Sequence, residues 1–164
     1  ALPIPVEEGA RVVSIDELYL DGAEPGPEVA VIGGGLTGCE CALQLARTGH
    51  AVHLVEMRDE LAPDANIRHR PILLAELEGE DIDVLCGAAA QAVTSEGVRV
   101  RTAAGEERTV PCTTVVCAVG QRSRTELADS LRDGAPFVRI VGDALRPANI
   151  TLAVYEAFHA ALDV

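Results

Sequence analysis

The chain has 164 residues, the size of one domain or slightly more, and 48% of them are hydrophobic, enough for a sizeable core. Its formal net charge of −13 at pH 7 argues against nucleic acids and anionic membrane surfaces as partners, because both require a basic patch. The sequence has no recognisable signal peptide or membrane-spanning run, and its five cysteines lack zinc-site spacing. These features predict a cytoplasmic protein without a bound metal.

The first 28 residues are punctuated by Pro and Gly and contain one short helical or strand piece, Val12 to Leu20. They resemble a connector and open without Met. We therefore expect residues 1–28 to lead in from an upstream segment of a longer protein.

Residues 29–38 read V-A-V-I-G-G-G-L-T-G, an apolar strand that runs into a glycine turn and a helix. Gly33, Gly35 and Gly38 occupy the G-x-G-x-x-G positions of the dinucleotide-binding fingerprint. Gly33 allows the tight turn, Gly35 lets a pyrophosphate approach the backbone, and Gly38 lets the helix pack closely on the sheet. The N-terminus of the following helix, with Leu36 and Thr37 in its first turn, favours an anion.

An acidic residue follows the next strand at the expected distance. The helix over 36–48 ends at a C-cap glycine, Gly49, and the strand over 51–55 runs into Glu56, about 20 residues beyond the turn. Glu56 is interpreted as the acceptor for the adenosine ribose hydroxyls, the alternative being an ordinary solvated acid. A carboxylate repels a 2′-phosphate and so favours NADH over NADPH, whereas the nearby Arg58 could accommodate that phosphate.

The remaining elements alternate between the two secondary-structure types. After a polar loop over 58–66, periodicity predicts a helix over 67–78 and a short strand over 84–86. Three segments with alternating polarity predict an antiparallel β-meander at 90–95, 97–102 and 107–111. An apolar strand over 113–119 comes next, followed by a short helix over 126–131, a last strand over 137–141 and a terminal helix over 149–162. The predicted fold class is α/β, a Rossmann-like parallel sheet flanked by helices with a three-stranded antiparallel β-meander spliced into it.

The order of these pieces resembles the two-dinucleotide flavoprotein reductases of the pyridine nucleotide-disulfide oxidoreductase superfamily. The resemblance is closer to the C-terminal region of the old-yellow-enzyme-related NADH oxidases and 2,4-dienoyl-CoA reductases. It is carried by the turn at 31–40 (V-I-G-G-G-L-T-G-C-E), the L-V-E-M run at 54–57, the meander, the strand and loop at 114–122, the I-V-G-D-A run at 140–144, and the ending at 153–161.

This resemblance implies a domain division and an activity. Residues 29–120 would form an NAD(P)-binding domain, and residues 121–164 would be the tail of an FAD-binding domain whose first half lies upstream. The longer parent would pass hydride from NADH to FAD, and then through FMN and a [4Fe-4S] cluster to an enone or another acceptor. The FMN and iron–sulfur sites are not carried by this chain. The alternative is a free-standing nucleotide-binding module without redox activity.

The resemblance also adds candidate residues. Glu40 would lie near the nicotinamide–flavin contact, although an acid there is equally well explained by the helix dipole. Asp143 would bond the FAD ribityl chain, or would simply cap a turn. Hydride transfer requires no protein acid or base, so no catalytic residue is expected. The expected partners are a nucleotide and the upstream domains of the same polypeptide. The complete set of candidate cofactor-binding residues is Gly33, Gly35, Leu36, Thr37, Gly38, Glu40, Glu56, Arg58, Gly120, Gly142 and Asp143.

Overall fold

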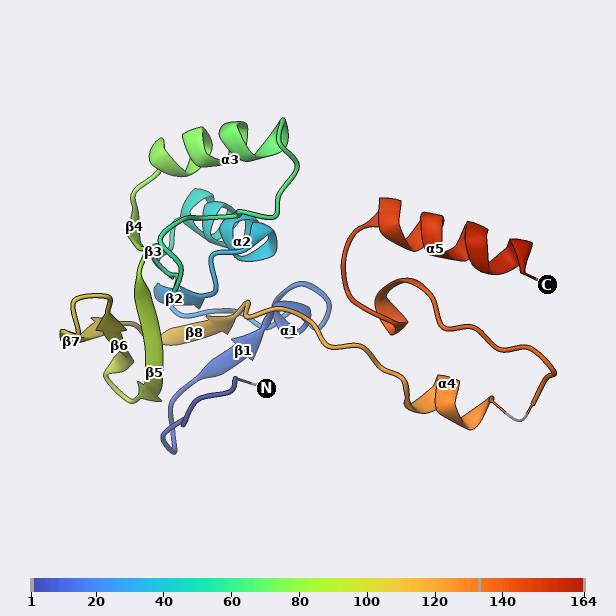
Figure 1. Cartoon of the computed structure of the whole chain (residues 1–164). Helices are drawn as coiled ribbons and strands as arrows, with labels where there is room; N and C mark the ends of the chain where they lie inside the picture. The colour runs from blue at the N-terminus through green and yellow to red at the C-terminus, as the bar shows by residue number, and fades with distance from the viewer. Residues whose placement is uncertain (1, 133, 164) are drawn as a thin grey trace. The chain divides into compact units, whose positions relative to one another are not determined.

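Two units make up the chain. The computed structural model describes residues 2–132 and 134–163, and its contacts divide the chain into Ala1–Val119 and Gly120–Val164 (Figure 1). The first unit contains β1 (Val12–Ser14), α1 (Ile15–Tyr19), β2 (Glu28–Ile32), α2 (Leu36–Arg47), β3 (Ala51–Val55), α3 (His69–Glu78), β4 (Ile82–Leu85), β5 (Ala88–Thr94), β6 (Gly97–Thr102), β7 (Glu107–Pro111) and β8 (Thr114–Cys117). The second contains α4 (Glu126–Ser130), a short 3₁₀ helix η1 (Gly142–Ala144) and α5 (Ile150–Leu162).

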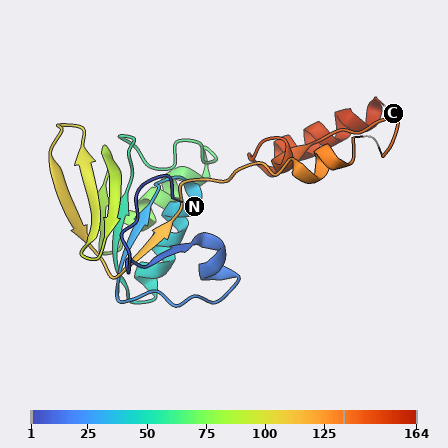
Figure 2. The same ribbon diagram turned by 90° about the horizontal axis from the view of Figure 1, so that it is seen from below.

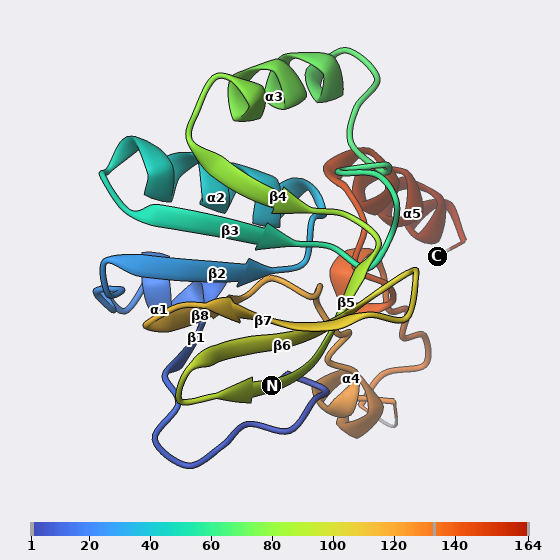
Figure 3. The same ribbon diagram turned by 90° about the vertical axis from the view of Figure 1, so that its left-hand side faces the viewer.

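Five parallel strands form the main sheet of the first unit, in the order β1-β8-β2-β3-β4. The β2 strand lies at its centre, paired in parallel with β3 on one side and β8 on the other. In Figure 3 the helices α2 and α3 cover one face of this sheet. The predicted Rossmann-like parallel sheet is therefore confirmed.

The apolar run in β2 is explained by burial on both faces of the sheet. Val29 and Val31 belong to the core shared with α2 and α3. The alternate residues Ala30 and Ile32 belong to a second core on the opposite face. Because successive side chains of a strand point to opposite faces, a run without polar positions is what this central strand requires.

The predicted β-meander is confirmed as a separate antiparallel sheet, in the order β5-β6-β7, spliced between β4 and β8. Val98 and Val100 are fully buried in the second core. The intervening Arg99 and Arg101 are exposed. In Figures 2 and 3 this small sheet covers the face of the parallel sheet opposite α2, which gives the unit three layers.

Local capping signals also set the ends of helices. Gly49 follows the last turn of α2 with φ +93°, and its N–H donates to the Ala46 carbonyl, as the predicted C-cap glycine should. The segment predicted as one helical or strand piece at 12–20 is in fact both, β1 followed by α1. Ser14 and Glu17 form a reciprocal capping box at that junction. The α3 helix starts at His69, two residues later than the periodicity predicted.

One predicted strand is wrong. Residues 137–141 form no strand, although the backbone at Val141 is extended, with φ −137° and ψ 163°. A strand needs a neighbour for its hydrogen bonds, and the described residues of the second unit offer none. The α5 helix begins at the N-cap Asn149, whose side chain accepts from the Leu152 N–H at 2.9 Å. It buries none of its residues.

Candidate functional site

The carboxyl ends of four parallel strands meet at one edge of the main sheet. There β2 passes into the glycine turn at Gly33, β3 into Glu56, β4 into Cys86 and β8 into Ala118. The Gly33 N–H donates to the Val55 carbonyl at 2.9 Å and ties the turn to the neighbouring strand. Ligands of open α/β sheets bind at this edge, so the sequence-predicted turn occupies the expected position for a binding site.

Two glycines of the turn are required by close packing. Gly33 has φ +110°, and a Cβ placed on it would overlap the Ala118 carbonyl at the end of β8. A Cβ on Gly38 would overlap the Gly33 carbonyl oxygen. The first turn of α2 therefore lies directly against the end of β2, and neither position has room for a side chain.

Gly35 has the opposite surroundings. It is the N-cap of α2, and a Cβ placed on it would meet nothing within 4 Å. The first turn of α2 holds no acidic residue, and Leu36 and Thr37 are exposed beside it. Backbone N–H groups at the start of a helix lack intrahelical acceptors and lie at the positive end of the dipole. This open surface can therefore accept an anionic group such as a phosphate.

The middle glycine, Gly34, has a role that the fingerprint did not reveal. Its N–H donates to Glu56 Oε2 at 2.6 Å, and its carbonyl accepts from the Ala62 N–H at 2.7 Å. A Cβ on Gly34 would come within 2.5 Å of Leu61 Cδ2 and 2.8 Å of Glu56 Cβ. The sequence signal was a glycine between Gly33 and Gly35, at the position where the motif allows any residue.

Glu56 is positioned by the turn that it faces. Only 9% of the residue is exposed, and its second oxygen, Oε1, accepts from the Arg58 N–H at 2.8 Å. A carboxylate has about four acceptor positions, so one bond to each oxygen leaves capacity for two further donors. The side chain can thus hold the turn and still accept from a diol, which fits a ribose.

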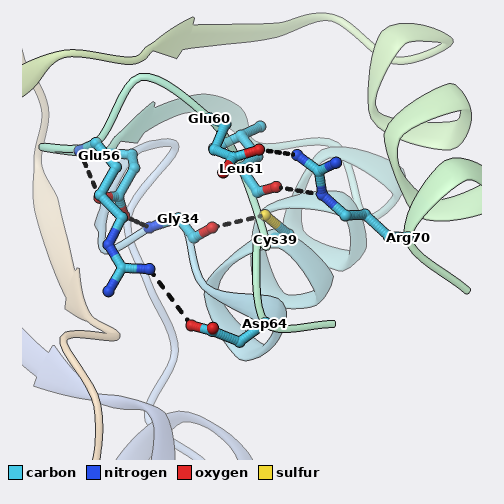
Figure 4. A network of polar contacts seen from close by, with 8 residues as sticks. Gly34, Cys39, Glu56, Glu60, Leu61, Asp64 and Arg70 are labelled. Carbon is cyan, nitrogen blue, oxygen red and sulfur yellow. Dashed lines mark hydrogen bonds and ion pairs between the residues drawn. The ribbon is translucent and has the colours of Figure 1, made fainter. Parts of the chain in front are cut away.

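The loop after Glu56 is braced by ion pairs (Figure 4). Arg58 Nη1 lies 3.3 Å from Asp64 Oδ2. From α3, Arg70 donates to the Leu61 carbonyl at 2.9 Å and to Glu60 Oε2 at 2.8 Å. From the sequence this segment is recognisable only as a polar loop, because the contacts of Arg70 join a helix to a loop at separations that no spacing rule covers.

A buried thiol completes the contacts of the Gly34 peptide. Burial, with smaller contributions from Cys86 and Glu56, raises the pKa of the Cys39 thiol to about 11. The group is therefore protonated at neutral pH and donates to the Gly34 carbonyl, with Sγ 3.4 Å from the oxygen. Cys39 thus supports the turn and is not a reactive thiolate.

Of the other candidate residues, one lies on α2 and three belong to the second unit. Glu40 is exposed in the second turn of α2. Gly120, Gly142 and Asp143 belong to the second unit. There the Gly142 N–H donates to Glu156 Oε2 at 2.8 Å. Asp143 Oδ1 accepts from the Ala148 N–H at 3.3 Å, a bond that closes a turn.

Within residues 2–132 and 134–163, no three His, Cys, Asp or Glu side chains are grouped so that they could hold a metal ion. In the same residues, no helix combines the length and the hydropathy of a membrane span.

Comparison with known proteins gives consistent matches over nearly the whole chain. A family model described as pyridine nucleotide-disulphide oxidoreductase matches residues 5–139. A bilirubin reductase from Mediterraneibacter gnavus is 36% identical over 162 residues, covering 96% of this chain and 25% of the relative. An NADH oxidase from Thermoanaerobacter brockii is 33% identical over 138 residues, covering 84% of this chain and 21% of the relative.

A solved structure of histamine dehydrogenase from Rhizobium sp. 4-9 shares the fold with a TM-score of 0.87 and 22% identity, covering 100% of this chain and 28% of that one. The chain therefore spans about a quarter of the length of the proteins that it matches.

Proposed function

This chain belongs to the pyridine nucleotide-disulphide oxidoreductase family, and from that premise we propose that its first unit binds NADH at the glycine turn. Two neighbouring features of the turn carry the proposal. The backbone of Gly35 is open at the start of α2, and the adjacent Gly34 is hydrogen-bonded to the carboxylate of Glu56, 22 residues further along the chain. The open helix N-terminus suits the pyrophosphate, and the two remaining acceptor positions of Glu56 suit the ribose hydroxyls.

NADH is favoured over NADPH by the charge beside the ribose. Glu56 would lie next to a 2′-phosphate, and two anions in contact repel each other. The name of one relative, an NADH oxidase, agrees with this preference. Bound nucleotide would supply the hydride chemistry, while the residues of this chain would bind and orient it.

In the longer protein, we propose that residues 29–120 form the pyridine-nucleotide domain and residues 121–164 the end of an FAD-binding domain. The relatives are about four times as long as this chain, which leaves room for the rest of a flavin domain and for the FMN and iron–sulfur groups implied by the resemblance. The whole protein would then pass hydride from NADH to FAD. The final acceptor would be chosen outside this chain.

The exposed face of α5 supports this proposal. Ile150, Val154, Phe158 and Leu162 lie on one side of the helix and are 84%, 62%, 61% and 67% exposed. A contiguous apolar face of this kind normally packs against more protein. The upstream half of the flavin domain is the occupant that the length of the relatives suggests.

Isothermal titration calorimetry on this chain tests the nucleotide site directly. We expect NADH to bind measurably and added FAD to be released on gel filtration, because only the tail of a flavin site would be present. Absence of heat with NADH or with ADP-ribose would overturn the proposed site. Retention of FAD by the isolated chain would contradict the division between the two domains.

A second candidate function is a nucleotide-binding module without redox activity. It is favoured by the single dinucleotide fingerprint in this sequence. The longer gene product, mixed anaerobically with NADH, separates the two. Bleaching of flavin absorbance supports the reductase, and an unchanged spectrum in a flavin-loaded protein supports the module.

A Gly35→Ala variant is expected to fold normally and to bind NADH at least about tenfold more weakly. The added methyl group meets no protein atom but projects into the space proposed for the pyrophosphate. Thermal unfolding without nucleotide and calorimetry with NADH measure the two effects separately. Unchanged affinity would show that the pyrophosphate lies elsewhere.

A further inference from the structure

The backbone of Arg58 is fixed beside the proposed ribose acceptor. Its N–H donates to Glu56 Oε1 at 2.8 Å, and its carbonyl accepts from the Gly87 N–H at 2.6 Å. The side chain starts from this fixed point and is 59% exposed. An arginine in this position is the group that accommodates a 2′-phosphate in NADP-binding sites.

In this chain the guanidinium of Arg58 is engaged elsewhere. Its Nη1 lies 3.3 Å from Asp64 Oδ2, further along the same loop. The loop between the two residues is held in place, because the Ala62 N–H donates to the Gly34 carbonyl and Arg70 donates to the Leu61 carbonyl. Asp64 therefore lies at a defined position from which it can hold Arg58.

Between Glu56 and Asp64 the loop offers no replacement for Arg58. Residues 56–64 contain four carboxylates and a single guanidinium. The guanidinium of Arg70, on α3, already donates to the Glu60 carboxylate and to a backbone carbonyl. A dianionic 2′-phosphate beside residues 56–64 would therefore face a negatively charged segment whose one cation is already paired.

We propose that Asp64 is a specificity-determining residue, which sets the site for NADH over NADPH by holding the Arg58 guanidinium away from a 2′-phosphate. The proposal rests on the function proposed above, namely that this edge of the sheet takes a pyridine nucleotide. Discrimination between NADH and NADPH is then shared by two residues. Glu56 repels the 2′-phosphate, and Asp64 binds the guanidinium of Arg58 that would otherwise attract it.

Calorimetry with ADP-ribose and 2′-phospho-ADP-ribose tests the proposal, because the two probes differ only in the phosphate. We expect Asp64→Asn to tighten binding of the phosphorylated probe about three- to tenfold and to leave ADP-ribose binding within about twofold. The shift is modest because the ion pair is exposed, with Asp64 92% accessible, so the variant should also fold normally.

Two further variants test whether the gain in affinity depends on the release of Arg58. Asp59→Asn removes the same charge from the same loop without releasing Arg58, and it should change the preference less than about twofold. Adding Arg58→Gln to Asp64→Asn should abolish the gain, because no guanidinium is then left to bind the phosphate.

An equal gain from Asp59→Asn, or a gain that survives Arg58→Gln, would overturn the proposal, as would an unchanged preference in Asp64→Asn. In each of these cases ADP-ribose still binds and the nucleotide site stands. If the unmodified chain binds neither probe, the proposed function itself fails.

Discussion

A Gly38→Ala variant is expected to lose about 3 kcal/mol of unfolding free energy, or to fail to fold. The new methyl group would overlap the Gly33 carbonyl oxygen; the methyl is fixed rigidly to its own backbone, and the oxygen is itself a backbone atom. Neither can rotate away, so α2 would have to separate from the end of β2 and disturb the buried core between them. Urea denaturation followed by circular dichroism measures the change.

The matched control is Gly79→Ala, at the C-terminal cap of α3. Its φ is −79°, and a Cβ there would lie 3.4 Å from the Glu76 carbonyl oxygen, an ordinary contact. We expect its stability to stay within about 1 kcal/mol of the unmodified chain. Equal stability of the two variants would show that α2 does not pack on the glycine turn as described.

Replacement of Glu56 by Ala is expected to weaken both the turn and the proposed nucleotide site. The buried Gly34 N–H and the Arg58 N–H would each lose a carboxylate acceptor, which should cost about 2 kcal/mol of stability. NADH binding should weaken at least about tenfold, because the charge-assisted bonds to the ribose are lost as well. Chemical denaturation without nucleotide and calorimetry with NADH measure the two losses separately.

Glu78→Ala removes an exposed acid at the end of α3 and serves as the control, with both quantities expected to stay unchanged. Glu56→Gln keeps the volume but leaves only one oxygen for two backbone donors, so it should fall between the two variants. If Glu56→Ala loses stability while its NADH affinity is unchanged, Glu56 only positions the turn and does not contact the ribose.

The sequence predicted the features of this fold that depend on local pattern. The apolar run of β2, the cap at Gly49 and the alternation of Val98 with Arg99 are each readable within a few residues. The strand predicted at 137–141 is wrong because strand formation does not depend on local pattern alone. Its residues suit an extended backbone, but a strand also requires a pairing partner, and the pattern of one segment carries no information about its neighbours.

In the candidate site, too, the local features were predictable from the sequence, whereas the contacts between distant residues were not. The positions of Gly33, Gly35 and Gly38 followed from the fingerprint. In the folded chain Gly33 and Gly38 leave no room for a Cβ, and Gly35 lies in open space. The contacts of Gly34 with Glu56 and Ala62 join residues more than 20 apart, so only the folded chain brings them together. The contacts of Arg70 with Leu61 and Glu60 span only 9 and 10 residues, but they join a helix to a loop, and no spacing rule identifies them.

The double attachment of the Gly34 peptide has a consequence for the kinetics of binding. A turn whose N–H and carbonyl are both already bonded is preorganised, so a ligand would lose little conformational entropy by ordering it. Association should then proceed without a slow rearrangement of the loop, with a single concentration-dependent phase in stopped-flow traces. Variants that weaken binding at this turn should accordingly change the dissociation rate much more than the association rate.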